Sequence, residues 1–127
     1  MKISKETYNK LIKKNKYHNK ITYYENIKFD SKKESQRYIE LKQLEKLGII
    51  KELELQKKFE LQESFKDNSN NTIRSINYYA DFFYYDNQEK VYIAEDVKSK
   101  ATKKDKVYCL KKKLFLYQYP NIIFKEV

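Results

Sequence analysis

The sequence predicts a mixed α/β (α+β) fold, in which a central mixed β-sheet of about four core strands is flanked by helices. Two apolar, aromatic runs within residues 78–98 have the pattern of a β-hairpin. Segments 31–47 and 102–119 have the periodicity and end signals of amphipathic helices. With 127 residues, 40% of them hydrophobic, the chain is long enough to form one domain with a real core.

The hairpin brings charged side chains together in an apolar setting. If its turn is centred between Gln88 and Glu89, Asp81 lies opposite Asp96 in the paired strands. Because side chains alternate along a strand, Lys98 projects from the same face as Asp96. Two carboxylates and an ammonium group are therefore expected to converge.

Two interpretations of this convergence are open. Carboxylates within about 5 Å of each other repel unless a cation lies between them, and Mg²⁺ binds one or two carboxylates together with water and phosphate. The alternative is an ordinary salt bridge of Lys98 with Asp81 or Asp96 on a solvated sheet face. A third carboxylate on another element would favour a metal site.

The first helix offers such a carboxylate. Asp30 or Ser31 is the predicted N-cap, Ser31 and Glu34 form a capping box, and the helix should end near Leu47, with Gly48 just beyond it. The predicted inward stripe consists of Tyr38, Leu41 and Leu44. Glu34 falls within this stripe, so it is either a capping residue alone or a carboxylate directed toward the sheet.

The remaining segments complete the predicted fold. Residues 21–29 should form a short hairpin, 49–62 a strand or a bent pair of strands, 66–71 a polar loop and 121–127 a last short strand. The second helix is expected from Thr102 or Lys103 to Tyr119. Its predicted inward stripe consists of Val107, Leu110, Leu114 and Tyr117.

Composition and charge restrict the function. The net charge of +10 points first to a polyanion such as nucleic acid, although a lysine-rich protein from an A/T-rich genome would carry the same excess. One Gly and one Pro exclude glycine-rich nucleotide-binding loops, and no segment has transmembrane length. The single Cys109 excludes an internal disulfide and indicates a reducing, cytoplasmic setting. We therefore expect neither a nucleotide cofactor nor a membrane partner.

Residues 1–20 are rich in lysine and poor in acids. They are expected to form a basic N-terminal arm, with residues 21–127 as the single domain. Lys16 and Lys20 are candidate phosphate contacts in this arm, and a frayed terminus is the alternative interpretation.

Four ordered blocks resemble a phage and prophage family within the PD-(D/E)XK nuclease superfamily. They are KYHNK at 16–20, FDSKKE at 29–34, ADF at 80–82 and EDVK at 95–98. The resemblance implies a restriction-endonuclease-like fold with a carboxylate on the first helix, an Asp on the second core strand and a D/E-x-K motif on the third. Ala80 stands where the signature has proline, and Ser99 where glycine is expected.

The resemblance also implies roles for these residues. Glu34, Asp81, Asp96 and the Val97 carbonyl would hold Mg²⁺, or Mn²⁺ in its place, and Lys98 would orient or help deprotonate the attacking water. A slip of one residue in register would place Glu95 opposite Asp81 instead of Asp96. Further phosphate contacts are expected from lysines that follow the third strand: Lys100, Lys103, Lys104 and Lys111.

The expected activity is that of a metal-dependent deoxyribonuclease. The resemblance favours cleavage of branched DNA such as Holliday junctions, in phage recombination, replication or packaging, and it allows a homodimer. Two other classes of function stay open. The chain could be a non-catalytic DNA-binding module with a nuclease-like fold, or a phage protein that binds a host protein.

Overall fold

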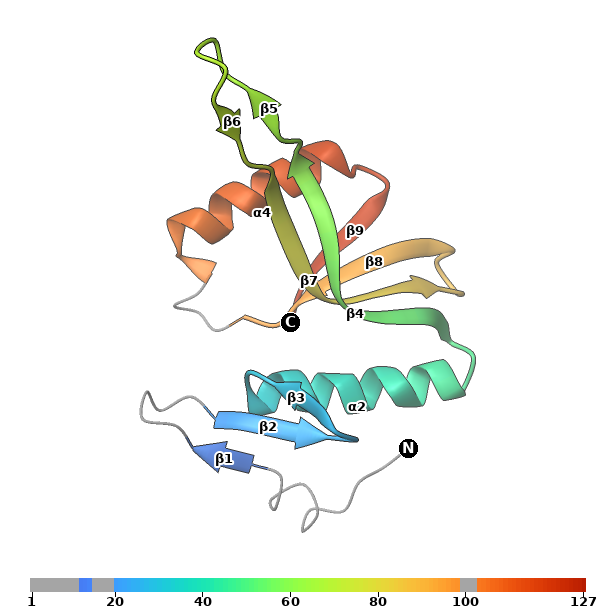
Figure 1. The fold of residues 1–127 in the computed structure, drawn as a ribbon. Coiled ribbons are helices and arrows are strands. Elements are labelled where there is room, and N and C mark those ends of the chain that lie inside the picture. Colours follow the sequence, from blue (N-terminus) through green and yellow to red (C-terminus); the bar gives the residue numbers. More distant parts are fainter. Residues whose placement is uncertain (1–11, 15–19, 99–102) are drawn as a thin grey trace.

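The central element is a four-stranded mixed sheet with a helix on each side (Figure 1). The computed structural model describes residues 12–14, 20–98 and 103–127, with side chains from residue 21 onward. The sheet has the order β4 (Ile50–Gln62), β7 (Ile76–Asp86), β8 (Val91–Asp96) and β9 (Ile122–Glu126). The first two pairings are antiparallel and β8 pairs with β9 in parallel, which confirms the predicted mixed α+β architecture.

A second, smaller sheet lies on the far side of the first helix (Figure 1). It consists of β1 (Ile12–Lys14), β2 (Lys20–Tyr24) and β3 (Ile27–Phe29). Glu25 and Asn26 connect β2 to β3 with positive φ angles of 51° and 65°, as a type I′ hairpin turn requires. The predicted hairpin is confirmed. Of the segment predicted as a basic arm, residues 1–11 and 15–19 lie outside the described residues, and 12–14 form β1.

Helix α2 (Lys32–Lys46) begins and ends as its sequence predicts. The Ser31 hydroxyl accepts a hydrogen bond from the Glu34 N–H at 3.1 Å, which identifies Ser31 as the N-cap. At the other end Gly48 has a φ of 77°, its N–H bonds the Glu45 carbonyl, and the Ile49 N–H bonds the Leu44 carbonyl. These two bonds form a Schellman motif, so the helix stops where glycine permits the left-handed conformation.

The hairpin of β7 and β8 has the predicted register. Its ladder runs from the pair Asp86↔Val91 to the pair Phe82↔Glu95, around a turn of residues 87–90. Asp81 and Asp96 follow directly at the open end of this ladder, so the two strands carry them to the same place in the sheet.

Strands β4 and β7 stay paired with each other, but the helix against which they pack changes halfway along their length. Leu55 pairs with Phe82 and Lys57 with Ala80, and between these pairs Gln56 has a φ of 52°, which is rare for a residue with a side chain. On one side of Gln56 the apolar side chains of both strands pack toward α2, and on the other side they pack toward α4 (Lys106–Gln118). Figure 1 shows that both strands bend partway along their length. The positive φ of Gln56 and the change in packing locate this bend near Gln56 and the neighbouring Asp81.

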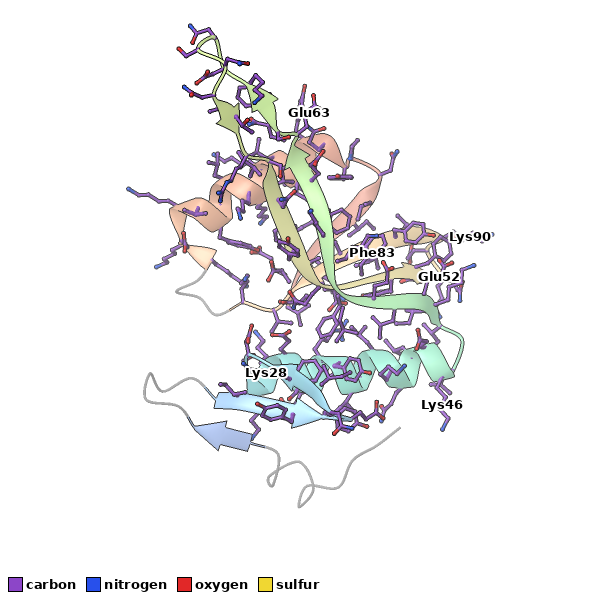
Figure 2. The ribbon with its side chains drawn as sticks, viewed as in Figure 1. Lys28, Lys46, Glu52, Glu63, Phe83 and Lys90 are labelled. Carbon is purple, nitrogen blue, oxygen red and sulfur yellow. The ribbon has the colours of Figure 1, made fainter. Side chains whose placement is uncertain are left out.

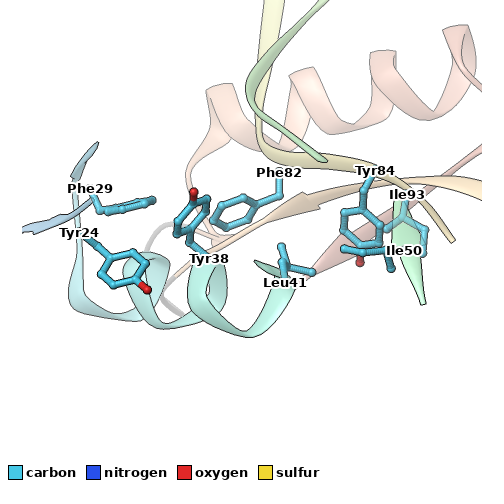
Figure 3. Close-up of a cluster of buried hydrophobic side chains, with 8 residues drawn as sticks. All are labelled: Tyr24, Phe29, Tyr38, Leu41, Ile50, Phe82, Tyr84 and Ile93. Carbon is cyan, nitrogen blue, oxygen red and sulfur yellow. The ribbon is translucent and has the colours of Figure 1, made fainter. Parts of the chain in front are cut away.

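Each half of the bent strand pair has its own core. In the α2 half, the rings of Tyr38 and Phe82 lie beside each other, and Leu41 points from the helix toward the sheet (Figure 3). In the α4 half, Phe59 contacts Phe115 edge to face with ring centroids 5.0 Å apart. Both cores are rich in aromatic rings, which supply most of the buried apolar surface that the strands need.

The prediction for the second helix was wrong in two respects. Helix α4 begins at Lys106, because Asp105 caps it by accepting from the N–H groups of Val107 and Tyr108. The predicted inward stripe is largely on the outside, with Val107, Leu110 and Tyr117 exposed to 62%, 58% and 82%. Tyr108 and Phe115 point inward instead. The helix carries two apolar stripes, and the one with the larger aromatic rings packs against the aromatic sheet.

A short hairpin extends the long strand pair away from the body. It consists of β5 (Phe65–Lys66) and β6 (Thr72–Ile73), and it begins just beyond Glu63 (Figure 2). The Asp67 carboxylate accepts hydrogen bonds from the N–H groups of Ser69 and Asn71 within its tip. The polar turn that the sequence predicts at 66–71 is thus present and is closed by an aspartate.

Candidate functional site

Three predicted acidic residues and one lysine meet where the long strand pair bends. Glu34 lies in the first turn of α2, Asp81 lies at the bend of β7, and Asp96 is the last residue of β8. The Gln56 side-chain amide donates to Asp81 Oδ1 at 3.1 Å and to Glu34 Oε1 at 3.4 Å. Gln56 of β4 thus links a carboxylate on the helix to a carboxylate on the sheet. Lys98 follows the end of β8 by two residues.

Asp96 is held by what we call the outer network, formed by Tyr78, Asp96 and Lys98. The Tyr78 hydroxyl donates a hydrogen bond to Asp96 Oδ2. Asp96 Oδ1 lies 3.1 Å from Lys98 Nζ, yet it is buried and accepts no well-directed hydrogen bond from the described residues. The salt bridge considered at the level of sequence is therefore present, and it leaves one buried carboxylate oxygen with remaining capacity to bind a cation.

Glu95 belongs to a separate inner network, formed by Arg37, Tyr84 and Glu95. Arg37 Nε and Nη2 donate to the two Glu95 oxygens at 2.7 and 2.6 Å, and the Tyr84 hydroxyl donates to Oε2. The Glu95 side chain is fully buried. Because its carboxylate is directed to Arg37 of α2, Glu95 does not lie beside Asp81, and the neighbour of Asp81 on β8 is Asp96.

The carboxylates of the site are short of positive charge. Burial, together with the charges of Asp81 and Asp30, raises the pKa of Glu34 to about 8 despite the opposing effect of Lys98. Burial and the neighbouring Asp96 also raise the pKa of Asp81, although the Val97 N–H donates to Asp81 Oδ2 at 2.8 Å and opposes this shift. A cation among these groups would relieve their mutual repulsion.

The donor set suits a hard divalent cation. Within residues 21–98 and 103–127, no three Asp, Glu, His or Cys side chains lie close enough to form a complete metal-binding group. Mg²⁺ does not require one, because it commonly uses one or two carboxylates and completes its octahedron with water and phosphate. Asp96 Oδ1 and the Asp81 carboxylate provide oxygens of this type, and the Gln56 Nε2 that donates to Asp81 also donates to Glu34.

The backbone around Asp96 and Lys98 is fixed from several directions. The Val127 N–H donates to the Asp96 carbonyl at 2.9 Å, and the Lys98 N–H donates to the Val127 carbonyl at 3.3 Å. Lys33 Nζ donates to the Lys98 carbonyl at 3.3 Å. The Lys98 ammonium also lies 5.2 Å from the centre of the Tyr108 ring, within the range of a cation–π contact. These contacts hold the end of β8 between both helices and β9.

Residues 14–126 match the model of a family described as "Protein of unknown function (DUF1064)". The chain belongs to this family. No curated protein and no solved structure matches it. In the part of the chain that the structure describes, no helix combines the length and the apolar character needed to cross a membrane.

The predicted phosphate-binding lysines of this DUF1064 family member are only partly described. Lys103 and Lys104 are exposed just before α4, and Lys111 is half-buried on that helix. Lys16 and Lys100 lie outside the described residues, as does the side chain of Lys20, whose backbone begins β2. Two of the predicted lysines, Lys103 and Lys104, are thus exposed in the segment between Lys98 and α4.

The sequence analysis did not predict several residues of the two networks. Arg37, one of two arginines in a lysine-rich chain, lies one helical turn after Glu34, and this spacing was an available signal. Tyr84 lies diagonally across the hairpin from Glu95, so the correct register also indicated that contact. Tyr78 offered no comparable signal, because the bend between it and Asp96 depends on the tertiary structure.

Proposed function

We propose that this protein is a Mg²⁺-dependent DNA endonuclease that hydrolyses phosphodiester bonds, with a preference for branched DNA. One observation carries the proposal. Asp81 and Asp96 lie at the open end of one hairpin, Lys98 Nζ lies 3.1 Å from a buried Asp96 oxygen, and Gln56 ties Asp81 to Glu34. Acidic oxygens can hold a metal ion that activates water, and a neighbouring lysine can stabilise the charge that develops on a phosphate.

The order of the elements supports the same proposal. Helix α2 precedes three antiparallel strands, and α4 then leads to β9, which pairs in parallel with β8. The acids occupy the first helix, the second core strand and the end of the third, which are the positions that the PD-(D/E)XK resemblance implies. This agreement in the order of the elements and in the positions of the acids supports the proposal.

The proposed chemistry divides among the residues of the site. When bound, Mg²⁺ supplies a water of lowered pKa and neutralises charge that develops on the phosphate. Asp81 and Asp96 would hold the ion, with Glu34 and the Val97 carbonyl as further oxygen donors. Lys98 would orient the attacking water and stabilise the charge on the phosphate, while Tyr78 keeps the Asp96 carboxylate in one orientation.

The charge of the chain supports DNA as the substrate. The net charge is +10, and Lys103 and Lys104 expose ammonium groups next to the segment that follows Lys98. Lysines of this kind contact phosphates without reading bases, which fits recognition of DNA shape better than recognition of a sequence. The preference for branched DNA is inferred from the resemblance.

The proposal can be tested with labelled four-way-junction, flap, duplex and single-stranded DNA in Mg²⁺ or Mn²⁺. We expect the wild type to cut branched substrates fastest and Asp96→Ala and Lys98→Ala to lose cutting. Glu89→Ala, at an exposed carboxylate in the turn of the β7–β8 hairpin, serves as a matched control that should cut normally.

Each negative outcome has a different meaning. If the wild type does not cut but binds DNA equally well in EDTA, the protein is a non-catalytic DNA-binding module. If it neither cuts nor binds DNA, the interpretation as a protein-binding factor takes precedence. If Asp96→Ala cuts like the wild type, the assignment of the site is wrong even though the protein is a nuclease.

A further inference from the structure

Arg37 connects helix α2 to strand β8 directly behind the candidate site. Its guanidinium group binds both oxygens of Glu95, at 2.7 and 2.6 Å, while Nη1 reaches the exposed Glu40 at 2.9 Å. Two parallel N–H···O bonds fix the orientation of a guanidinium group as well as its distance from the carboxylate. The helix can therefore neither slide along β8 nor rotate on it without breaking this pair.

Each member of this pair lies close in the sequence to one of the proposed site carboxylates. Arg37 follows Glu34 by three residues, so both project from neighbouring positions on one side of α2. On the strand, Glu95 directly precedes Asp96, and the two side chains point to opposite faces of β8. The contact between Arg37 and Glu95 thus sets the position of the helix that carries Glu34 relative to the strand that carries Asp96.

We propose that Arg37 and Glu95 form a positioning pair, which fixes Glu34 relative to Asp96 and thereby sets the geometry of the acidic site toward a divalent cation. Neither residue touches the reacting atoms. This role rests on the proposed metal-dependent function. It adds an assignment that the active-site motif does not contain, because Glu95 precedes the D-x-K triplet and Arg37 lies outside the first-helix block.

A purely structural role makes a different prediction. A buried ion pair contributes little net stability, and replacing all its members by apolar residues of similar size is often neutral or stabilising. Loss of residues that hold metal ligands in place has a different effect, because it typically lowers metal affinity or activity 10- to 100-fold. Apolar replacement of the whole inner network therefore separates the two roles.

The test compares the wild type with the triple variant Arg37→Met/Glu95→Leu/Tyr84→Phe, which leaves no member of the inner network unpaired. We expect its urea unfolding midpoint to stay near that of the wild type. Its Mn²⁺ affinity, measured by calorimetry without DNA, should fall about 10- to 100-fold. Its kcat on the best DNA substrate should fall by a similar factor, while its KM for DNA changes less than about twofold.

Two further variants keep the test decisive if the triple variant folds poorly. Arg37→Lys keeps the positive charge but loses the two-pronged contact, so it should lower Mn²⁺ affinity by an intermediate factor. Lys42→Gln removes another ion pair of α2, with Lys42 Nζ 3.0 Å from Glu45, and should leave Mn²⁺ affinity unchanged. An equal effect of these two substitutions would overturn the proposal.

Failure of this inference and failure of the nuclease proposal are distinguishable. Wild-type protein that binds Mn²⁺ but cuts no DNA would refute the nuclease, and the positioning pair would then be judged on Mn²⁺ affinity alone. Wild-type protein that binds no Mn²⁺ would refute both. Cutting by the wild type, together with unchanged Mn²⁺ affinity and kcat in the triple variant, would refute only the positioning role.

Discussion

Two neighbouring acids of β8, Glu95 and Asp96, have the same kinds of partner but different surroundings. Each accepts from a tyrosine hydroxyl of β7, and each is paired with one cation. Glu95 is sealed between the sheet and α2, with both oxygens bound by Arg37. Asp96 is bound on one oxygen by Tyr78, and its other oxygen lies near a Lys98 side chain that is 26% exposed.

The difference teaches how to separate a structural carboxylate from a functional one. Burial alone does not do so, since the Glu95 and Asp96 side chains are 0% and 1% exposed. What differs is how completely the oxygens are satisfied. In the inner network both carboxylate oxygens accept hydrogen bonds, whereas in the outer network Asp96 Oδ1 accepts no well-directed hydrogen bond from the described residues and lies near two further acids. A buried acid with remaining acceptor capacity is the better candidate for binding a ligand.

A matched pair of isosteric substitutions is the strongest test of the difference between Glu95 and Asp96. Glu95→Gln leaves the buried Arg37 without its anion and should cost about 3–5 kcal/mol of unfolding free energy. Asp96→Asn should preserve that free energy, because it removes a repulsion with Asp81, but it should lower cleavage more than about 100-fold. Urea unfolding in EDTA and cleavage rates in Mg²⁺ measure the two effects. Equal losses of stability would show that the networks do not differ.

The cations of the two networks should also differ. Lys98→Met leaves the buried Asp96 Oδ1 without its ammonium partner, and because the Lys98 side chain is 26% exposed, the unfolding free energy should fall by only about 1–3 kcal/mol. Cleavage should nevertheless fall about 10²- to 10³-fold, as when one preorganised donor to a transition state is removed. Arg37→Met should destabilise the protein more than Lys98→Met does. A Lys98→Met variant that cuts at the wild-type rate would remove lysine from the proposed mechanism.

The burial of Glu34, together with the neighbouring carboxylates of Asp81 and Asp30, predicts a dependence of stability on pH. The Glu34 pKa is about 8 in the folded protein and near 4.5 when exposed, so between these values the folded state holds more protons than the unfolded state. Stability should therefore decline as pH rises from about 5 to 8. Thermal unfolding without divalent cations should show this decline, and Glu34→Gln should weaken it. An unchanged profile in Glu34→Gln would mean that another group titrates.

Local signals in the sequence were enough to predict the ends of α2 and the register of the β7–β8 hairpin. The capping box at Ser31, the glycine after Leu47 and the alternation on either side of residues 87–90 each depend on a few adjacent residues. The exposed stripe of α4 could not be predicted in this way. Two apolar stripes compete on that helix, and only the aromatic surface of the assembled sheet decides which one is buried.

In the candidate site, too, the sequence predicted what depends on adjacent residues and missed what depends on tertiary packing. The approach of Asp81 and Asp96 depends on hairpin register, and the sequence predicted it. The separation of Glu95 from Asp96 depends on α2 supplying an arginine to one face only, and the link from Gln56 to Glu34 depends on the bend of β4. Both require packing between elements distant in the sequence, which periodicity does not encode.

The two tyrosines give the finest test of the comparison. Tyr84→Phe removes one donor from a carboxylate that keeps both contacts with Arg37, so it should cost about 1 kcal/mol of unfolding free energy. Tyr78→Phe leaves Asp96 Oδ2 without its hydroxyl donor and should cost about 1.5–3 kcal/mol in EDTA. Mg²⁺ should recover part of the Tyr78→Phe loss, because a cation can take over the unsatisfied oxygen, and none of the Tyr84→Phe loss. Urea unfolding with and without Mg²⁺ measures all four values. Losses that are equal and insensitive to Mg²⁺ would mean that Asp96 is as fully satisfied as Glu95, and the outer network would then be a second structural network.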